Sequence, residues 1–339
     1  MNVLKKFPDL CKKLEKHPSA ALRKQFQLRI LKHPSAQERW ESEMLEQEPL
    51  RSILSNRKAE GWWYMDSPAG VYKKYEGWVW SLLFAAELGA PRREKRLRQS
   101  CEYFMEQCFS EKNGAFESAG RPSRTIACFV AHACYFLTYF GYETDPRVKS
   151  AFQSLGNNLG SDGGMRCFVM DTCLNETCTM AIPKFLKASS LLTPAERKKL
   201  LGSSVEKSAS RLFACNIDRY QPVETTQWHK FISGKPLKEI RAAKAKFHVS
   251  GEYKIKSTWT RFQFPLHYDS DLLETLIYLG RLKFKSNEAL QLAAHRILTA
   301  GQRDGWKAGR TLKGKLWSDL PYENDWITLR ALEALSYYG

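Results

Sequence analysis

The sequence predicts an all-α fold, an (α/α)6 toroid in which six helical hairpins form a closed ring. Two observations support this prediction. A short corner with a glycine and an aromatic residue recurs along the chain, and apolar helices that end at glycine follow the corners. Hairpins of this kind cannot bury their apolar faces alone, so they stack, and closing the stack covers both of its ends. An open helical solenoid is the alternative arrangement.

The corners carry the strongest signal. Four clear corners are centred on Gly61, Gly114, Gly163 and Gly305, each preceded by an acidic or amide side chain. The last interval is about three times each of the earlier ones, which predicts two further corners in between. Degenerate versions of the motif place these near residues 216 and 258. In each corner, glycine lets the chain turn sharply and the apolar side chain that follows packs beneath the turn.

The segments after the corners have the period of a helix and not that of a strand. Leu272, Leu276 and Leu279, for example, recur at helical spacing. Glycine is the usual helix stop, because it adopts the left-handed conformation at little cost. The glycines that end three of these segments are Gly89, Gly141 and Gly280.

Two stretches differ from the repeats. Residues 1–50 contain Lys-His-Pro-Ser twice, at residues 16–19 and 32–35, and we predict an N-terminal helical extension there, with residues 51–339 as the toroid domain. Residues 230–256 are crowded with lysine and arginine. A flexible lid over the mouth of the ring and a solvated basic loop both fit this composition.

The composition is that of a globular protein. The 339-residue chain is 43% hydrophobic and 26% charged. No apolar run approaches the roughly 20 residues that a membrane helix needs, and the first six residues lead into no apolar signal core. We therefore expect a cytoplasmic protein whose nine cysteines are thiols.

The charge favours an anionic partner. The 53 Lys and Arg residues against 36 Asp and Glu give a formal net charge of +17. Such an excess raises the local concentration of anions such as nucleic acid, acidic lipid, diphosphate or acidic polysaccharide. It does not choose among them.

The corners resemble the Gln-x-x-x-Gly-x-Trp (QW) motif of squalene and oxidosqualene cyclases and the Gly-Gly-Phe corners of protein prenyltransferase β subunits. Residues 56–63 resemble the QW motif with Asn56 in place of glutamine, and residues 302–306 keep the glutamine but are one residue shorter. The likeness covers residues 51–339 and implies the terpene cyclase and prenyltransferase toroid. Because that superfamily includes cyclases, prenyltransferases and non-enzymatic binders, it implies a fold more directly than an activity.

The resemblance to class II terpene cyclases implies a general acid. These enzymes protonate an alkene with the central acid of an Asp-x-Asp-Asp motif. The matching segment here, residues 267–271, offers Asp269 and Asp271 as candidate catalytic residues but lacks the final aspartate. Asp271 also stands where it would cap the helix that begins at Leu272.

An aromatic-rich stretch runs into the same helix and predicts a cavity for a hydrophobic ligand such as an isoprenoid. The candidate lining residues are Trp259, Arg261, Phe264, His267, Tyr268 and Trp306. Ordinary core packing is the competing interpretation.

The resemblance to protein prenyltransferases, which bind zinc through Asp, Cys and His, implies a metal site. The candidate ligands follow the third corner and are Asp162, Cys167, Cys173, Glu176 and Cys178. The histidine that the family places at the start of the last helix has no counterpart in residues 323–328. Zinc is thus the candidate cofactor without its expected histidine, and buried thiols with capping acids are the alternative.

Three functions remain open. The first is a terpene cyclase-like or prenyltransferase-like toroid with an aromatic-lined cavity. The second is a non-catalytic toroid that binds a protein or anionic partner, and the third is an (α/α)6 lyase or glycosidase acting on an anionic polysaccharide. An apolar cavity that reaches Asp269 and Asp271 would favour the first, a filled ring centre the second, and a polar groove the third.

Overall fold

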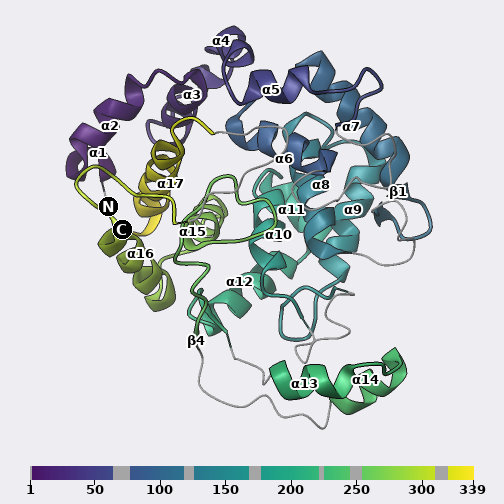
Figure 1. The fold of residues 1–339 in the computed structure, drawn as a ribbon. Coiled ribbons are helices and arrows are strands. Elements are labelled where there is room, and N and C mark those ends of the chain that lie inside the picture. The colour runs from purple at the N-terminus through teal and green to yellow at the C-terminus, as the bar shows by residue number, and fades with distance from the viewer. Residues whose placement is uncertain are drawn as a thin grey trace.

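The chain is mostly helical, which confirms the expected all-α class (Figure 1). The computed structural model describes residues 2–63, 77–117, 126–167, 177–220, 225–244, 254–309 and 320–339. The strands within these ranges are short two-residue pairs. No helix in the same ranges is both long enough and apolar enough to cross a membrane.

The first half of the chain contains α1 (Val3–Lys6), α2 (Pro8–Glu15), α3 (Ala20–Arg29), the 3-10 helix η1 (Pro34–Gln37), α4 (Glu41–Glu46), α5 (Leu50–Ser55), α6 (Trp78–Leu88), α7 (Lys95–Cys108), α8 (Ala127–Tyr139) and α9 (Pro146–Asn157). The second half contains α10 (Ala181–Ser189), α11 (Pro194–Leu201), α12 (Ser204–Ala214), α13 (Thr225–Ile232), α14 (Leu237–Lys244), α15 (Leu272–Arg281), α16 (Glu288–Ala300) and α17 (Glu323–Tyr338). Strand β1 (Phe109–Ser110) pairs with β2 (Ala115–Phe116), and β3 (Arg219–Tyr220) pairs with β4 (Lys254–Ile255), both antiparallel.

The four clear corners are turns of the expected kind. Their glycines have positive φ angles, namely 116° at Gly61, 58° at Gly114, 81° at Gly163 and 117° at Gly305. The side chains that follow these glycines are buried beneath the turns: Trp63, Phe116, Met165 and Trp306. Each corner joins a helix before it to a more deeply buried helix after it.

The first and last corners share a further contact. The indole N–H of Trp63 donates to the carbonyl of Ile53 at 2.5 Å, and that of Trp306 donates to the carbonyl of Ile297 at 2.6 Å. Each tryptophan therefore reaches back into the helix before its own corner. The two ends of the repeat region are built alike, although one corner is a residue shorter.

The two degenerate corners form a single corner. Asn216 and Ile217 have φ angles of 45° and 66°, and Ile217 is buried as in the other corners. However, β3 pairs directly with β4, the strand that leads to Trp259. The prediction of a separate corner near residue 258 is thus wrong, because residues 221–253 are inserted into the one corner between α12 and α15.

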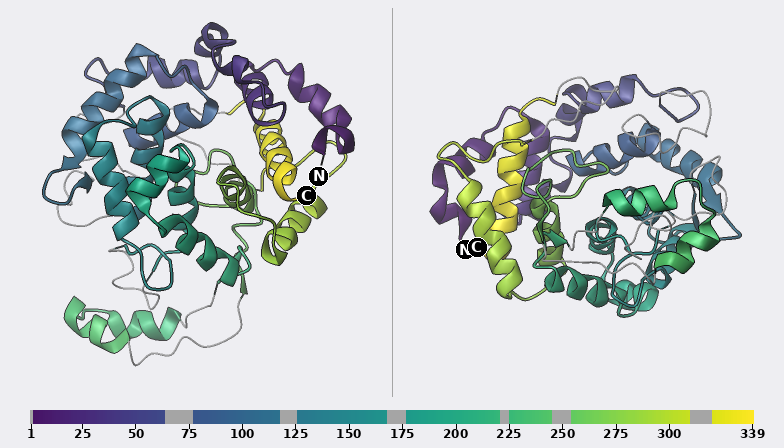
Figure 2. Two further views of the ribbon diagram at one scale, coloured as in Figure 1. Left: turned by 180° about the vertical axis from the view of Figure 1, so that it is seen from behind. Right: turned by 60° about the horizontal axis from the view of Figure 1, so that its bottom comes forward.

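Six helices, which we call the inner helices, contact one another in sequence. Helix α6 contacts α8, α8 contacts α10, α10 contacts α15, and α15 contacts α17. Helix α17 also contacts α3, which in turn contacts α6, so the series of contacts returns to its start. Helices α5, α7, α9, α12 and α16 lie outside them (Figures 1 and 2). All eleven residues of α6 and all nine of α10 are buried.

The N-terminal region packs directly on the last helix. Leu22 and Phe26 of α3 belong to the same apolar core as the inner helices. Lys13 of α2 forms an ion pair with Asp325 of α17 at 2.5 Å, and the two chain ends lie side by side (Figures 1 and 2). The domain boundary at residue 50 stays a prediction, but α3 occupies a place among the inner helices.

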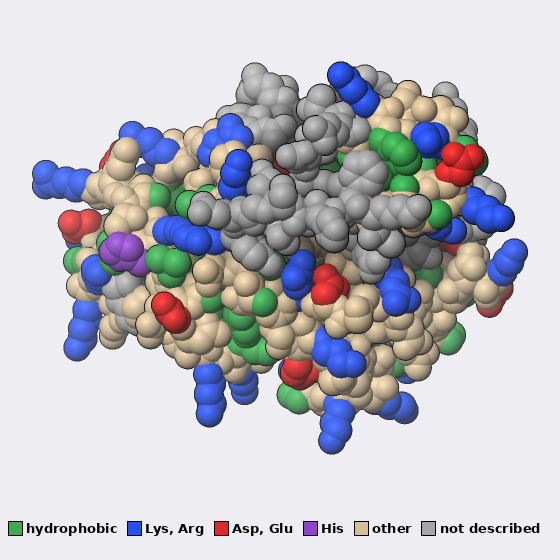
Figure 3. Space-filling model, turned by 90° about the horizontal axis from the view of Figure 1, so that it is seen from below, with side chains coloured by type: hydrophobic (Ala, Val, Ile, Leu, Met, Phe, Trp, Pro, Cys, Tyr) green, Lys and Arg blue, Asp and Glu red, His purple; other side chains and the backbone are tan. Residues whose placement is uncertain are grey.

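The basic segment, residues 230–256, is described at residues 230–244 and 254–256. Residues 225–244 form two helices, α13 and α14, and not an irregular loop, while a role as a lid stays a prediction. Helices α13 and α14 stand apart from the other helices in the front and back views (Figures 1 and 2). The face seen from below shows more Lys and Arg side chains than acidic ones (Figure 3). The apolar residues of α13 and α14 explain the helices, because they fall on facing sides and bury one another.

We predict that the third corner is intolerant of a side chain at Gly163. A Cβ there would lie 2.3 Å from the backbone oxygen of Lys207 in α12, and the φ of 81° is itself unfavourable for alanine. Gly141, which follows α8, also has a positive φ, but the nearest atom to its added Cβ is Nη1 of Arg98 at 3.5 Å, an ordinary contact. Urea denaturation of Gly163→Ala should show a loss of about 3 kcal/mol in the free energy of unfolding, against about 1 kcal/mol for Gly141→Ala. Equal losses would contradict the close packing of this corner on α12.

Candidate functional site

Charged side chains occupy the space between the inner helices. None of them is more than 2% exposed. We call the following six residues the charge network: Glu87 of α6, Lys184 and Lys187 of α10, Glu274 of α15, and Arg330 and Glu333 of α17. So many buried charges are unusual, because a buried ion is tolerated only when it is paired.

The two lysines join three helices. Lys187 forms an ion pair with Glu87, and its Nζ also lies 3.9 Å from Oε1 of Glu274. Lys184 donates to Oε2 of Glu274 at 2.6 Å and to the backbone carbonyl of Asp269 at 2.5 Å. Helix α10 is therefore tied to α6 on one side and to α15 on the other.

The remaining charges extend the network to α17 and α3. Glu333 Oε1 accepts from Nε of Arg281 at 2.8 Å, and its Oε2 lies 3.6 Å from Nη1 of Arg29. Nη2 of Arg330 lies 3.9 Å from Oδ1 of Asp271. Arg29 ends α3 and Arg281 ends α15, so the contacts of Glu333 link the first inner helix to the last two.

Two acids of the network, Glu87 and Glu333, have pKa values below the usual one in spite of their burial. Burial by itself would raise the pKa of Glu87, but Lys187 and Arg330 hold that pKa below its usual value. Burial acts in the same way on Glu333, and Arg281 and Arg29 likewise hold its pKa low. Paired charges therefore lie between the inner helices in the part of the chain that the structure describes.

Two neutral histidines lie beside the lysines. Burial, followed by the nearby charges of Lys187 and Lys184, lowers the pKa of His267 to about 3, and the same causes lower that of His132. Both rings pack edge-on against Trp80, at centroid distances of 5.4 and 5.6 Å. Near neutral pH these histidines add no charge to the interior.

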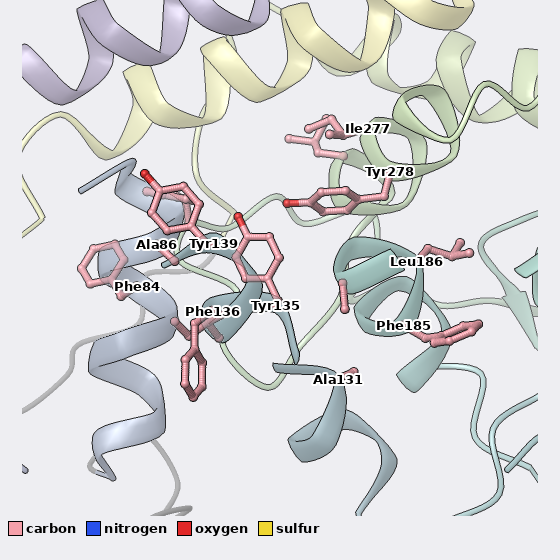
Figure 4. Close-up of a cluster of buried hydrophobic side chains, with 14 of the residues drawn as sticks. Phe84, Ala86, Ala131, Tyr135, Phe136, Tyr139, Phe185, Leu186, Ile277 and Tyr278 are labelled. Atoms are coloured by element: carbon pink, nitrogen blue, oxygen red, sulfur yellow. The ribbon is translucent and has the colours of Figure 1, made fainter. Parts of the chain in front are cut away.

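Aromatic rings surround the charges. Figure 4 shows Tyr135 and Tyr139 of α8 and Tyr278 of α15 among the apolar side chains between the inner helices. The Nζ of Lys187 lies 4.4 Å from the centre of the Tyr135 ring and 5.9 Å from that of Tyr278. The face of an aromatic ring stabilises a buried ammonium group, so these two tyrosine rings help to stabilise the charge of Lys187.

A pocket of about 220 Å³ opens where the inner helices end. It is lined by one acid, Glu333, and four bases, namely Arg29, Lys32, Arg92 and Arg281. Because a helix C-terminus carries a partial charge of roughly −0.5, the helix ends largely offset the excess of bases. The pocket is thus polar and nearly balanced in charge.

Asp271 serves as a helix cap. Its side chain accepts from the backbone N–H of Glu274 at 2.7 Å and from that of Gln263 at 3.3 Å. Burial raises its pKa to about 6, although Arg330 opposes this shift. Asp269 is half-buried nearby, and its backbone carbonyl is held by Lys184. The catalytic role of both aspartates stays a prediction.

The hollow that the described residues form beside Asp269 measures about 10 Å³. A single water needs a space of about 10–15 Å³, so this hollow is far too small for an isoprenoid. It is lined by Thr258, Arg261, Gln263, Leu266, Asp269 and Ser270.

The other predicted cavity residues are mostly packed against protein. Phe264 stacks on Trp326 with ring centroids 4.6 Å apart, and His267 is buried against Trp80. Trp306 packs on Phe7 at a different corner from the other candidates. Trp259 is fully buried, Arg261 is exposed, and Tyr268 is 36% exposed. Their role in ligand binding stays a prediction.

The predicted metal ligands are only partly within the described residues, and Cys173 and Glu176 lie outside them. Asp162 is engaged in its corner, where it accepts from the hydroxyl of Thr177 at 2.7 Å and from the N–H of Gly164 at 2.9 Å. Cys167 and Cys178 are half-buried. Within the residues that the structure describes, no three side chains of metal-binding type cluster together. The zinc site stays a prediction.

The charge network was not predicted from the sequence. The available signal was a set of charges inside otherwise apolar helices, such as Glu87 in α6 and the pair Lys184 and Lys187 at i and i+3 in α10. A helix considered alone cannot show where the partner of such a charge lies. The partners come from other helices, about 90 to 100 residues away in the chain.

Comparison with known proteins yields only distant structural likenesses. No family model and no curated protein matches this chain. Among solved structures, a type II terpene cyclase from Scytonema, in complex with its product merosterolic acid A, is 12% identical. The alignment covers 85% of this chain and 94% of that one, with a TM-score of 0.33. Because its TM-score is low, this likeness supports no conclusion about the fold or activity of this chain.

We predict that Lys187→Met strongly destabilises the protein. The substitution leaves Glu87 buried without its ion-pair partner, and breaking a buried pair costs about 3–5 kcal/mol. Adding Glu87→Gln should recover part of that loss, because the orphaned charge is then removed. The matched control, Lys199→Met on exposed α11, should change the free energy of unfolding by less than about 0.5 kcal/mol. A loss no larger than the control's would contradict the pairing.

We predict a specific pH dependence for Asp271→Asn. The folded pKa of Asp271, about 6, lies above the value of about 3.9 for an unfolded chain, so its ionisation opposes folding as the pH rises. The stability of the wild type relative to the variant should therefore fall by about 2 kcal/mol between pH 4 and pH 7. Urea denaturation across this range measures the difference. A difference that rises with pH would instead indicate a carboxylate stabilised by Arg330.

Proposed function

We propose that this protein is a closed α/α toroid that acts as a non-catalytic binding protein for an anionic macromolecule. Its interior serves structure, and its outer surface makes the functional contacts. The observation that carries the proposal is the set of paired charges that the described residues place between the inner helices, with aromatic rings around them. An apolar ligand would have to displace these pairs and leave buried charges without partners, which is costly.

The series of contacts among the inner helices supports ring closure. Five hairpins are formed around the corners, and α2 with α3 supplies the sixth, because α3 bridges α17 and α6. Closure by N-terminal helices explains why residues 51–339 alone contain five corners and not six. The contact between Glu333 and Arg29 would then join the N-terminal and C-terminal helices at the point where the ring closes.

The net charge supports an anionic partner. A formal charge of +17 gives the surface a field that concentrates polyanions. The polar pocket at the helix ends contributes little to this preference, since its bases are offset by Glu333 and by the helix dipoles.

A cyclase-like enzyme is the second candidate. It is favoured by Asp271, a fully buried carboxyl with a pKa raised to about 6, since a general acid needs such a shift. In that case the chain would protonate an isoprenoid from Asp271, with Phe264 and His267 nearby. The small hollow beside Asp269 weighs against it.

The lyase or glycosidase alternative has less support. Glycosidases use two carboxyl groups that flank the scissile bond. The pocket at the helix ends contains only Glu333, which two arginines already occupy.

Two measurements on the full chain test the proposal. We expect strong retention on a heparin column, with elution only at high salt, and no product by mass spectrometry after incubation with squalene or prenyl diphosphates. Product formation that Asp271→Asn abolishes, with the fold intact by circular dichroism, would establish the cyclase alternative instead. Weak retention at low salt would contradict an anionic partner.

A further inference from the structure

We infer that the hairpin of α13 and α14 binds the phosphate backbone of a nucleic acid. This inference rests on the proposed function and names its partner. The hairpin is the part of the described chain that the ring fold explains least, because it interrupts a corner that the repeats build without it.

The hairpin has its own apolar core. Trp228 and Ile240 are buried together, with Phe231, Ile232 and Ala243 packed against them, and this cluster is separate from the main core. The rings of Trp228 and Phe231 stack with centroids 5.7 Å apart. An insertion that buries its own apolar residues does not need the ring to cover it, so its outer surface can face a partner.

The exposed surface of the hairpin is basic. Residues 225–244 contain five basic side chains and one acid, Glu239. Lys230, Lys238 and Arg241 are exposed on the two helices. Lys235 lies 3.9 Å from Glu239, but this pair is well exposed and offsets little of the charge.

The hairpin lacks the apolar surface that a membrane or peptide partner would use. The large hydrophobic residues that are exposed in the described chain lie outside it: Leu4, Ile255, Tyr268, Leu292 and Tyr322. Lys235 covers the ring of Phe231 at 4.1 Å. Interfacial helices insert apolar side chains and peptide interfaces depend on buried anchors, so a partner recognised by charge alone fits better.

Nucleic acid has the matching chemistry. Its phosphates are closely and regularly spaced, and lysine contacts release bound counterions, which drives binding without reading the sequence. Trp228 is buried, so it is not available to stack on bases. We therefore expect affinity for DNA and RNA of any sequence, with a steep dependence on salt.

The test is fluorescence anisotropy of the full chain with a labelled DNA duplex over a range of salt concentrations. Lys230→Glu with Lys238→Glu should weaken binding at least about tenfold and reduce the salt slope by about two, one for each lost phosphate contact. The matched control, Lys198→Glu with Lys199→Glu on exposed α11, makes the same change in net charge and should weaken binding less than about twofold. The milder pair Lys230→Gln with Lys238→Gln guards against a fold lost to charge reversal and should show an intermediate loss.

The outcomes separate this inference from the proposed function. Equal losses in the hairpin and α11 variants would overturn the role of the hairpin while leaving an anion-binding surface. Binding to vesicles of phosphatidylserine but not to the duplex would also overturn it, in favour of a membrane partner. Heparin retention with no binding to DNA or RNA would refute nucleic acid as the partner but leave the proposed anionic partner standing. No binding to any polyanion would refute both proposals.

Discussion

The packing of the inner helices depends on the ion pairs of Lys187. This side chain lies between Glu87 of α6 and Glu274 of α15, while its own helix, α10, also contributes Lys184. Taking such charges out of water is costly, and the cost is recovered only when each charge meets its partner in good geometry. A shift of one helix would leave several charges without partners at once. The network therefore restricts how the helices are placed relative to one another, even where apolar residues of the same size would give greater stability.

Under the proposed function, this constraint separates the interior, which maintains the fold, from the surface, which binds the partner. The interior holds charges that pair across helices, although Glu87 Oε2, Glu274 Oε1 and Arg330 Nε have no hydrogen-bond partner among the described residues. The pocket at the helix ends is nearly balanced in charge. The corners, in contrast, are local units that tolerate insertion. Strands β1 and β2 pair across a short turn, and β3 and β4 form the same kind of pair although residues 221–253 separate them in the chain. Function has room to vary at such a corner. The α13–α14 hairpin is inserted there, with a core of its own and a basic surface.

Local features were predicted well from the sequence, and features that depend on distant contacts were not. The corners at Gly61, Gly114, Gly163 and Gly305 could be predicted because a positive φ favours glycine at one position of each turn. The split corner was misassigned because the pairing of Arg219 with Ile255 spans an insertion that breaks the spacing of the repeats. The place of α3 and the partner of each buried charge were also missed, since both depend on residues far apart in the chain. Of the candidate site, the sequence supplied Asp271 and its role as a helix cap, but not the Arg330 contact or the network around it.

A crystal structure determined under xenon pressure would test the central claim most directly. Xenon enters apolar cavities and avoids sites filled by paired charges. We predict no xenon between the inner helices, with electron density for the side chains of Glu87, Lys187 and Glu274 in contact with one another. Xenon or an elongated lipid-like density in that space would contradict the account, because it would show that the interior is an apolar ligand cavity and not a charge network.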